Sequence, residues 1–311
     1  QNKFELIALC EIDKNKTKNL QNYSLPIYSS VNELIKNHQL DYVTLCTPSG
    51  LHYSQAKFFL SKKINVITEK PIALKLQHTL NMINLAKKNN CKLYVVKQNR
   101  FNPTVTLVKN LIKNKKLGKI YLVNVNLFWN RNQNYFNLAK WRGTKKLDGG
   151  IFWNQGSHYF DLLCWLFGRM ESIQSFTSKL KVKVETEDVG VVNIKWKSGL
   201  LGSMNMTILA DKNREGSLTI ISEKGMIKIG GKALNKIELF EIKNFNIKLK
   251  NKISYNTESV YGKGHFDFYK DVSKNRNKNI PNSIYQEYIN TVEFLESSYL
   301  SSHKSKIVKL K

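Results

Sequence analysis

The 311-residue sequence lacks any long hydrophobic run. No apolar stretch approaches the roughly 18–20 residues that a helix needs to cross a bilayer. We therefore expect no insertion into a membrane. The first residues, Q-N-K-F-E-L-I-A-L-C-E-I-D, are typical of a strand followed by acidic residues and not of a secretory signal peptide. These two absences predict a cytoplasmic protein.

Cysteine is also scarce, and its spacing indicates no metal or redox motif. The four cysteines stand apart in apolar runs and form no C-x-x-C pair; they are Cys10, Cys46, Cys91 and Cys164. We expect no metal site, and four buried thiols in a reducing compartment.

Acidic residues are few, since 23 Asp and Glu stand against 50 Lys and Arg, for a net charge of +27. Such a charge raises the question of a nucleic-acid partner. However, the lysines are spread along the whole chain among Asn and Ile, as in genomes biased toward A- and T-rich codons. No zinc-finger spacing, aromatic RNA-binding strand or recognition helix is present. We expect no nucleic-acid partner, and a positive surface that attracts an anionic substrate.

The dinucleotide-binding motif G-x-G-x-x-G is missing as well. It normally follows the first strand of its fold, about 20 residues before an acidic residue. The sequence starts where the second strand of that fold is expected, so we expect an N-terminal truncation that removes the first strand and its glycine turn. In the strand order 3-2-1-4-5-6 the first strand is central. The chain is then expected to have a gap in mid-sheet, and to bind cofactor poorly or fold badly.

The residues that are present indicate two domains, as the length allows. In the first part, short apolar runs alternate with helical patterns. Strands are expected at 4–10, 42–46, 64–68 and 92–96, and helices at 31–37, 49–62 and 76–89. Continuous apolar runs between helices predict a parallel sheet covered on both faces. We predict an α/β Rossmann-type dinucleotide-binding domain over residues 1–99.

The second part has a different pattern. Helices are expected at 103–116, 147–168, 264–274 and 285–302, and strands at 119–129, 170–184, 189–196, 200–207, 217–221 and 226–229. Short connections at 197–199 and 223–225 predict an antiparallel meander. We predict an α+β domain over residues 100–311 with a large, mostly antiparallel open sheet. Its uncovered face is expected to join subunits into a homodimer or homotetramer.

Polar residues mark the carboxyl ends of the expected parallel strands, where ligands bind in such sheets. Glu11 follows the first strand, where an acid holds the adenosine ribose and repels a 2′-phosphate, so NAD is favoured over NADP. T-P-S at 47–49 follows the second strand, and small groups there leave helix-terminal N–H donors free for phosphate. E-K-P at 69–71 follows the third, and Lys70 can reach a substrate hydroxyl.

The helix expected at 147–168 carries an unusual polar pair. Asp148 is a plausible N-cap, and the glycine pair at 149–150 would let the backbone approach a ligand. Asn154 and His158 are four residues apart and project from one face. A buried amide and a buried imidazole need partners, so either they satisfy each other or a substrate satisfies them.

These motifs resemble the Gfo/Idh/MocA family of oxidoreductases over nearly the whole chain. E-K-P at 69–71 and G-G-x-x-x-[D/N]-x-G-x-H at 149–158 are its two signatures. R-F-N-P-T-V, A-K-W-R-G-T and N-Q-G-S-H-Y-F-D-L-L-x-W are similar to the sugar-nucleotide branch. Members of that branch oxidise the C3 hydroxyl of UDP-N-acetylglucosamine or its uronic acid for lipopolysaccharide and other bacterial surface polysaccharides. The resemblance implies an NAD-dependent oxidoreductase with a UDP-sugar substrate.

The resemblance also assigns residue roles. Lys70 and His158 become the catalytic pair, and His158 suits the base because its ordinary pKa leaves it largely neutral. Lys70 would stabilise the developing alkoxide, and the reverse division of labour remains open. The cofactor-binding set is Glu11, Thr47, Pro48, His52, Glu69 and Lys70. The substrate-binding set adds Arg142, Thr144, Asn154 and Gln155 to the catalytic pair. Many relatives carry Asp at position 154, and Asn there is a feature of the sugar-nucleotide branch.

Three other functions are compatible with parts of the sequence. Within enzymes, an inositol or simple-sugar dehydrogenase is the runner-up, and W-R-G-T at 141–144 together with Asn154 argues against it. A non-catalytic NAD- or sugar-binding regulator has no need for both Lys70 and His158. A nucleic-acid-binding role ranks third, and steep salt-dependent DNA binding would revive it.

Overall fold

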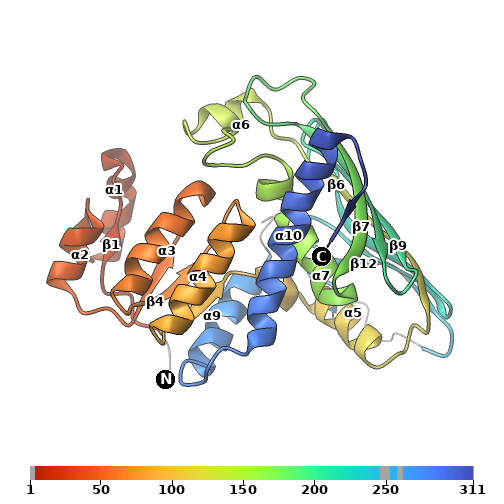
Figure 1. Cartoon of the computed structure of the whole chain (residues 1–311), viewed down its shortest axis with the longest axis horizontal. Helices are drawn as coiled ribbons and strands as arrows, with labels where there is room; N and C mark the ends of the chain where they lie inside the picture. Colours follow the sequence, from red (N-terminus) through yellow and green to blue (C-terminus); the bar gives the residue numbers. More distant parts are fainter. Residues whose placement is uncertain (1–3, 246–252, 258–261, 311) are drawn as a thin grey trace.

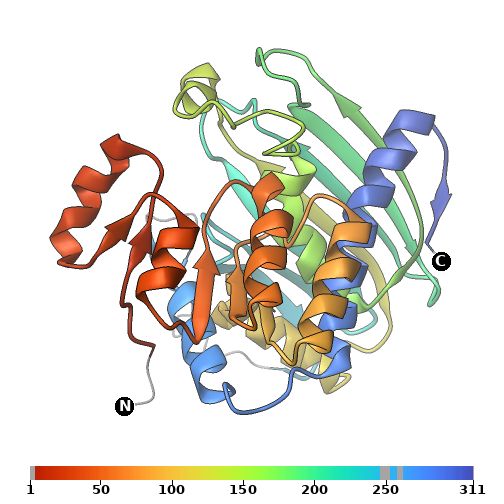
Figure 2. The same ribbon diagram turned by 60° about the vertical axis from the view of Figure 1, so that its left-hand side comes forward.

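The computed structural model describes residues 4–245, 253–257 and 262–310. A smaller α/β part and a large sheet lie on either side of the long C-terminal helix α10, Asn282–Lys304 (Figure 1). The turned view again places blue α10 beside the orange helix of the smaller part (Figure 2). This helix contacts α4 of the first part and α7 and β7 of the second. One helix therefore ties the two parts together.

The strands of the first part form two separate parallel sheets. One holds β1 (Leu9–Cys10) and β2 (Ile27–Tyr28), and the other holds β3 (Tyr42–Leu45), β4 (Asn65–Thr68) and β5 (Leu93–Val95). Among the described residues no strand joins them. This arrangement agrees with the expected gap at the place of a central strand.

Three expected helical segments of the first part are present: α2 (Val31–Asn37), η2 with α3 (Ser49–Leu51 and His52–Ser61) and α4 (Leu76–Lys88). Two further helices precede them, α1 (Lys14–Leu20) and η1 (Gln21–Tyr23). The hydroxyl of Ser30 accepts from the Asn32 N–H and so caps α2. Helix α1 was not expected, because its lysine-rich sequence buries no residue and shows no apolar stripe.

The three-stranded sheet is covered on both faces, but one cover comes from the far end of the chain. Ile67 and Val96 pack with Phe268 and Val272 of α9 (Gly264–Lys274), whereas their neighbours in sequence pack on the α3 and α4 side. The predicted boundary between residues 99 and 100 falls inside the short helix η3 (Gln98–Phe101) and stays a prediction. Chain order and spatial order therefore differ at α9.

The large sheet has eight strands in the order β12-β11-β10-β6-β9-β8-β7-β13. The strands are β6 (Ile120–Phe128), β7 (Met170–Ser178), β8 (Val189–Trp196), β9 (Leu201–Thr207), β10 (Glu215–Ser222), β11 (Gly225–Gly230), β12 (Lys236–Ile242) and β13 (Val308–Lys309). All neighbours are antiparallel except β6 and β9. The mostly antiparallel sheet is confirmed. A simple meander is wrong, because β6 lies between β9 and β10.

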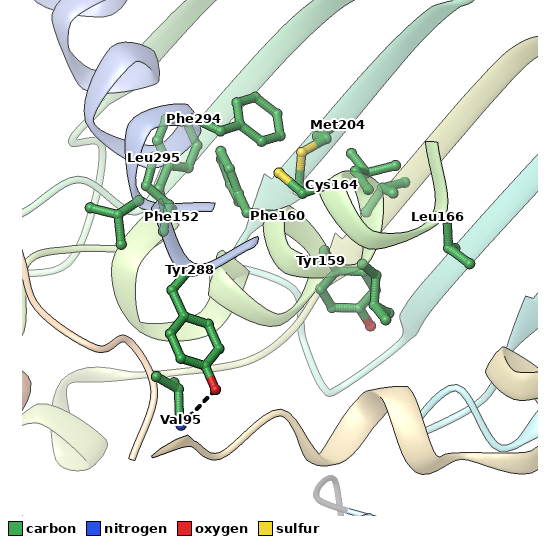
Figure 3. Packing of buried hydrophobic residues seen from close by; sticks show 14 of the residues in the cluster. Val95, Phe152, Tyr159, Phe160, Cys164, Leu166, Met204, Tyr288, Phe294 and Leu295 are labelled. Carbon is green, nitrogen blue, oxygen red and sulfur yellow. Dashed lines mark hydrogen bonds between the residues drawn. The ribbon is translucent and has the colours of Figure 1, made fainter. Parts of the chain in front are cut away.

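The helices of the second part are α5 (Pro103–Lys113), α6 (Gln133–Asn137), the π-helical turn η4 (Phe152–Gly156) and α7 (Ser157–Phe167). Among them, η4 and α7 contact the sheet through Phe152 at Gly190 of β8 and Tyr159 at Gly216 of β10. Phe160 of α7 packs on Phe294 of α10 with ring centroids 4.4 Å apart (Figure 3). The Val95 N–H donates to the Tyr288 hydroxyl at 3.3 Å, which anchors α10 to β5.

The thiol prediction is half right. Cys91 and Cys164 are buried, but Cys10 and Cys46 are exposed. The prediction is wrong for the latter two because Cys10 ends β1 and Cys46 follows β3, and both strands lie at sheet edges.

The described residues contain no cluster of three or more metal-ligating side chains. In the same part of the chain, no helix is long and apolar enough to cross a membrane.

Candidate active site

Four predicted site residues line one pocket where the first part meets α7. Lys70 reaches it from the end of β4, and Asn154, Gln155 and His158 reach it from η4 and α7. The remaining lining residues are Asn99, Trp129, Arg131, Tyr135, Tyr159, Lys232 and Ala233. The structure thus brings the predicted catalytic pair to a single cavity from positions far apart in the sequence.

Lys70 is half-buried and precedes a cis peptide bond to Pro71. Its ammonium donates a hydrogen bond of 2.8 Å to the main-chain oxygen of Asn154. Burial lowers the pKa of Lys70, and the carboxylates of Glu69 and Asp148 oppose that shift. This bond joins the carboxyl end of β4 to the π-helical turn.

His158 is the second residue of α7 and is half-buried. Burial lowers the pKa of His158 well below its usual 6.5, and the positive charge of Lys70 acts in the same direction. Nε2 of the ring lies 3.2 Å from the amide nitrogen of Gln98. The ring is therefore neutral near pH 7, which a proton acceptor requires.

Asn154 and His158 do not bond to each other. The Asn154 amide nitrogen donates to the buried carboxylate of Asp148, which also accepts from the Gly143 N–H at 2.7 Å. The expectation that Asp148 caps the helix is wrong. The N-cap position is three residues later, at Ile151, and the helical turn begins at Phe152. The buried carboxylate of Asp148 orients Asn154 instead.

The glycine pair serves the protein's own packing. Both residues have positive φ, +88° at Gly149 and +106° at Gly150. An added Cβ at Gly150 would lie 2.4 Å from a carboxylate oxygen of Glu187 and 2.7 Å from the hydroxyl of Tyr299. The expected close approach of this backbone to a ligand stays a prediction. The structure shows a close approach to the half-buried side chains of Glu187 and Tyr299, and Glu187 accepts from the Ile151 N–H and from the Tyr299 hydroxyl.

The predicted cofactor residues follow the carboxyl ends of the parallel strands. Half-buried Glu11 follows β1 and accepts from the Asp13 N–H at 2.9 Å. Thr47 and Pro48 follow β3, and the Thr47 hydroxyl donates to the side chain of Gln55 at 2.6 Å. All three residues lie where ligands bind in such sheets.

Glu69 adds a carboxylate beside Lys70, the predicted catalytic lysine. One of its oxygens lies 3.7 Å from Nε2 of His265 on α9, and the other accepts from the Lys70 N–H. Burial opposes ionisation, but the hydrogen bond from His265 and the charge of Lys70 outweigh it and lower the pKa of Glu69. Glu69 is thus a negative charge at neutral pH.

His52 does not line the cofactor cleft as predicted. It is only 1% exposed, and its ring nitrogens lie 2.8 Å from the Pro71 oxygen and 2.9 Å from the Thr47 oxygen. Burial is the main cause that lowers the pKa of His52. The ring of His52 links the segment after β3 to the segment after β4, so the role of His52 is structural.

Arg142 and Thr144 lie beside the pocket and outside its lining. The Arg142 guanidinium stacks on Tyr135 at 4.3 Å and on Trp141 at 4.7 Å, and its Nε is buried with no protein partner in the described ranges. The Thr144 hydroxyl donates to the Trp141 oxygen at 2.8 Å and accepts from the Leu147 N–H. Arg142 contacts the pocket lining at Tyr135, from where its guanidinium can turn toward a ligand. The hydroxyl of Thr144 stabilises the backbone turn at residues 141–147.

Sequence reasoning missed several pocket residues. Asn99 lines the pocket and Gln98 contacts His158; both follow β5, so the strand-end rule that found Lys70 applies to them too. Trp129 and Arg131 follow the end of β6. Lys232 follows β11 and carries no local signal, because only the folded sheet brings it to the cavity.

Comparisons with known proteins agree with this architecture. A family model for an oxidoreductase family with an NAD-binding Rossmann fold matches residues 1–97, and a model of the GFO/IDH/MocA C-terminal domain matches residues 105–228. Since the two models match more than half of the chain, it belongs to the Gfo/Idh/MocA oxidoreductase family. The predicted family, fold class and NAD-binding fold are confirmed.

Two solved structures are similar over 99% of this chain. The WlbA dehydrogenase from Bordetella pertussis, in complex with NADH and UDP-GlcNAcA, is 36% identical with a TM-score of 0.93 over 90% of its own chain. The WlbA dehydrogenase from Chromobacterium violaceum, with the same ligands, is 40% identical with a TM-score of 0.90 over 88% of its own chain.

Curated relatives match over a shorter stretch. An uncharacterized oxidoreductase of Synechocystis is 27% identical over 216 residues, which is 65% of this chain and 58% of that protein. The myo-inositol 2-dehydrogenase of Thermotoga maritima is 26% identical over 207 residues, which is 64% of this chain and 59% of that protein. The chain spans less than two thirds of the length of these relatives.

Proposed function

We propose that the protein is an NAD-dependent dehydrogenase that oxidises the C3 hydroxyl of a UDP-N-acetyl-hexosamine or its uronic acid. The observation that carries this proposal is the meeting of Lys70 and His158 in one pocket. The proposal is supported by the two dehydrogenases that are 36% and 40% identical and were solved with NADH and UDP-GlcNAcA. We further propose that the product serves bacterial surface polysaccharides.

The residues that would meet NAD fit its two ends. Glu11 at the end of β1 suits the adenosine ribose, and Glu69 and Lys70 at the end of β4 suit the nicotinamide side. No G-x-G-x-x-G is present for the pyrophosphate. Bound NAD would supply the hydride acceptor.

The pocket side chains account for the proton chemistry. His158, neutral because burial lowers its pKa, accepts the proton of the substrate hydroxyl. Lys70 donates a hydrogen bond to the same oxygen and stabilises the alkoxide character that develops there. The main-chain oxygen of Asn154 holds the Lys70 ammonium at 2.8 Å, and the buried Asp148 carboxylate holds the Asn154 side chain.

The charge of the pocket supports the uronic acid as substrate. Lys70, Arg131 and Lys232 line it, and no carboxylate does among the lining residues of the described chain. Arg131 stacks on Trp129 at 4.9 Å and on Tyr135 at 5.2 Å, which holds its guanidinium at the pocket. Cations that face a cavity favour anionic groups such as a carboxylate or a diphosphate.

The open face of the large sheet supports a homodimer or homotetramer. Leu201, Leu122, Ile221 and Met226 are cross-strand neighbours on β9, β6, β10 and β11. The first three are 51%, 40% and 38% exposed. A contiguous apolar row on a sheet face that no helix covers is typical of a subunit interface.

A panel of UDP-sugars with NAD tests the function. We expect nicotinamide reduction with UDP-GlcNAcA, weaker reduction with UDP-GlcNAc, and none with myo-inositol or free glucose. NADP should replace NAD poorly, because Glu11 repels a 2′-phosphate. If no UDP-sugar is oxidised while NADH still binds, a regulator that binds cofactor without turnover replaces the enzyme.

A further inference from the structure

Gln98 is a buried side chain with only half of its amide satisfied. It begins η3, directly beyond β5, and is 2% exposed. Its amide nitrogen lies 3.2 Å from Nε2 of His158, whereas its amide oxygen is buried with no hydrogen-bond partner in the described part of the chain. A buried carbonyl oxygen without a donor is costly. The structure nevertheless keeps this amide against His158.

The contact determines which ring nitrogen carries the proton. An amide nitrogen donates hydrogen bonds and does not accept them. Nε2 of neutral His158 therefore accepts from Gln98, and the ring proton is on Nδ1. The tautomer of a histidine is set by the hydrogen bonds of its nitrogens.

Charged groups surround the ring from several elements. Lys70 faces it from the end of β4, Lys97 from the end of β5, His265 from α9 and Asp161 from α7 itself. The carboxylate of Asp161 is occupied by Lys97 and by Arg100. Within the described ranges, Gln98 supplies the hydrogen bond to the imidazole.

The main chain of Gln98 is held in place by α9. A Cβ on Gly264, the first residue of α9, would lie 1.9 Å from the Gln98 main-chain oxygen. The start of α9 is thus in close contact with the Gln98 backbone, which holds that backbone in place. The side-chain amide is the group that can still move. Rotation about its last torsion exchanges the nitrogen and the oxygen.

We propose that Gln98 is a positioning residue that serves His158 in both of its protonation states. This inference rests on the proposed function, in which His158 is the base. In the resting state the amide nitrogen donates to Nε2. Nε2 has one lone pair, so the substrate hydroxyl displaces the amide N–H from Nε2 when the substrate binds. The substrate O–H bond then breaks as an N–H bond forms on Nε2, and a half-turn of the amide brings its unpartnered oxygen to accept from that imidazolium N–H. No bond of Gln98 is made or broken.

Nitrogen NMR of the histidine-labelled protein tests the tautomer without substrate. We expect His158, assigned by comparison with His158→Asn, to be the Nδ1–H tautomer at neutral pH, and Gln98→Leu to lose that preference. Gln77→Leu is the matched control, because Gln77 is exposed and bonds to Asn81 on α4. A wild-type Nε2–H tautomer, or one unchanged in folded Gln98→Leu, would overturn the proposal.

Gln98→Glu gives a second measurement. Its carboxylate accepts from the imidazolium but offers nothing to the neutral ring, so the ring should titrate about one pH unit higher than in the wild type. The acid limb of kcat/KM should move with it. An unmoved titration in the folded variant would overturn the role of Gln98. If the His158 ring of Gln98→Glu titrates at a higher pH but the wild-type protein oxidises no UDP-sugar, that result would count against the proposed function alone.

Discussion

At the scale of single residues, the chemistry depends on which charged groups the fold desolvates. Burial lowers the pKa of both Lys70 and His158, and the pKa of His158 falls well below its usual 6.5. Each also feels the positive charge of other groups, Arg142 at Lys70 and Lys70 at His158. A neutral imidazole beside an ammonium that is easily neutralised is suited to proton transfer near pH 7.

His158→Asn should lower kcat by about 10²–10⁴-fold with little change in NADH affinity, because the base is removed and the cofactor residues stay. Lys70→Met should also lose rate. In the wild type, the base works while neutral, so kcat/KM should stay level from neutral pH down past pH 6.5 and fall only at the lowered pKa of His158. Steady-state kinetics measure all three. Full activity of His158→Asn would remove His158 from the role of base.

Arg142→Ala should mainly raise KM for the UDP-sugar and leave kcat nearly unchanged, because a guanidinium that binds phosphate or carboxylate acts equally before and during reaction. Arg214→Ala is the control, since Arg214 is exposed and paired with Asp211. Initial-rate measurements with varied UDP-sugar separate the two constants. A fall in kcat at unchanged KM would place Arg142 in the chemical step instead.

At the scale of elements, α7 is fixed by a buried ionic cluster below His158. Asp161 accepts from Arg100 at 2.7 Å and 2.8 Å and lies 2.7 Å from the ammonium of Lys97. Burial opposes ionisation of Asp161, but the charges of Arg100 and Lys97 outweigh it and hold the pKa of Asp161 far below its usual range. The cluster joins α7 to η3, so it also sets the distance between His158 and Gln98.

Asp161→Asn should reduce the free energy of unfolding by about 3–5 kcal/mol, because the buried Lys97 loses its carboxylate and the buried Arg100 keeps only its pair with Glu287. In the wild type, this contribution is present above the unfolded pKa of about 3.9 and is lost as the pH falls through the depressed folded pKa. Urea denaturation at several pH values measures both effects. Asp211→Asn, which breaks only the exposed pair with Arg214, should change stability by less than about 1 kcal/mol. Equal effects of the two variants would contradict the buried cluster.

At the scale of the whole molecule, the two parts share one core and one cavity. Helix α10 packs on α4, α7 and β7, and α9 completes the first sheet. Lys70, which follows β4, and His158 of α7 line the same cavity, and β4 and α7 belong to different parts of the molecule (Figure 1). In the described part of the chain, one face of the large sheet carries no helix, which is the face proposed above for a subunit contact.

The double variant Leu122→Lys, Leu201→Lys should convert the oligomer to a monomer, because it places two charges in register within the apolar row of the open face. Light scattering after size-exclusion chromatography measures the mass. Leu300→Lys, at an exposed leucine of α10, is the matched control and should keep the wild-type mass. A wild-type protein that is monomeric at all concentrations would contradict the proposed interface.

Much of the site was readable in the sequence because it depends on local patterns. Apolar runs that alternate with helical periods predict parallel strands, and Glu11, Thr47 and Lys70 follow the carboxyl ends of β1, β3 and β4, although β1 lies in a separate sheet. The four-residue spacing of Asn154 and His158 placed both in one pocket. Period and strand-end chemistry are properties of short segments, so the sequence alone determines them.

Only the tertiary structure decided which side chains touch. Gln98 against His158, Asp148 against Asn154 and Asp161 against Arg100 are contacts between segments whose distance is set by packing. The placement of β6 between β9 and β10 and of α9 on the first sheet also depends on which apolar faces remain to be covered. Such choices depend on the whole core, because a buried face has many possible partners and packing selects one.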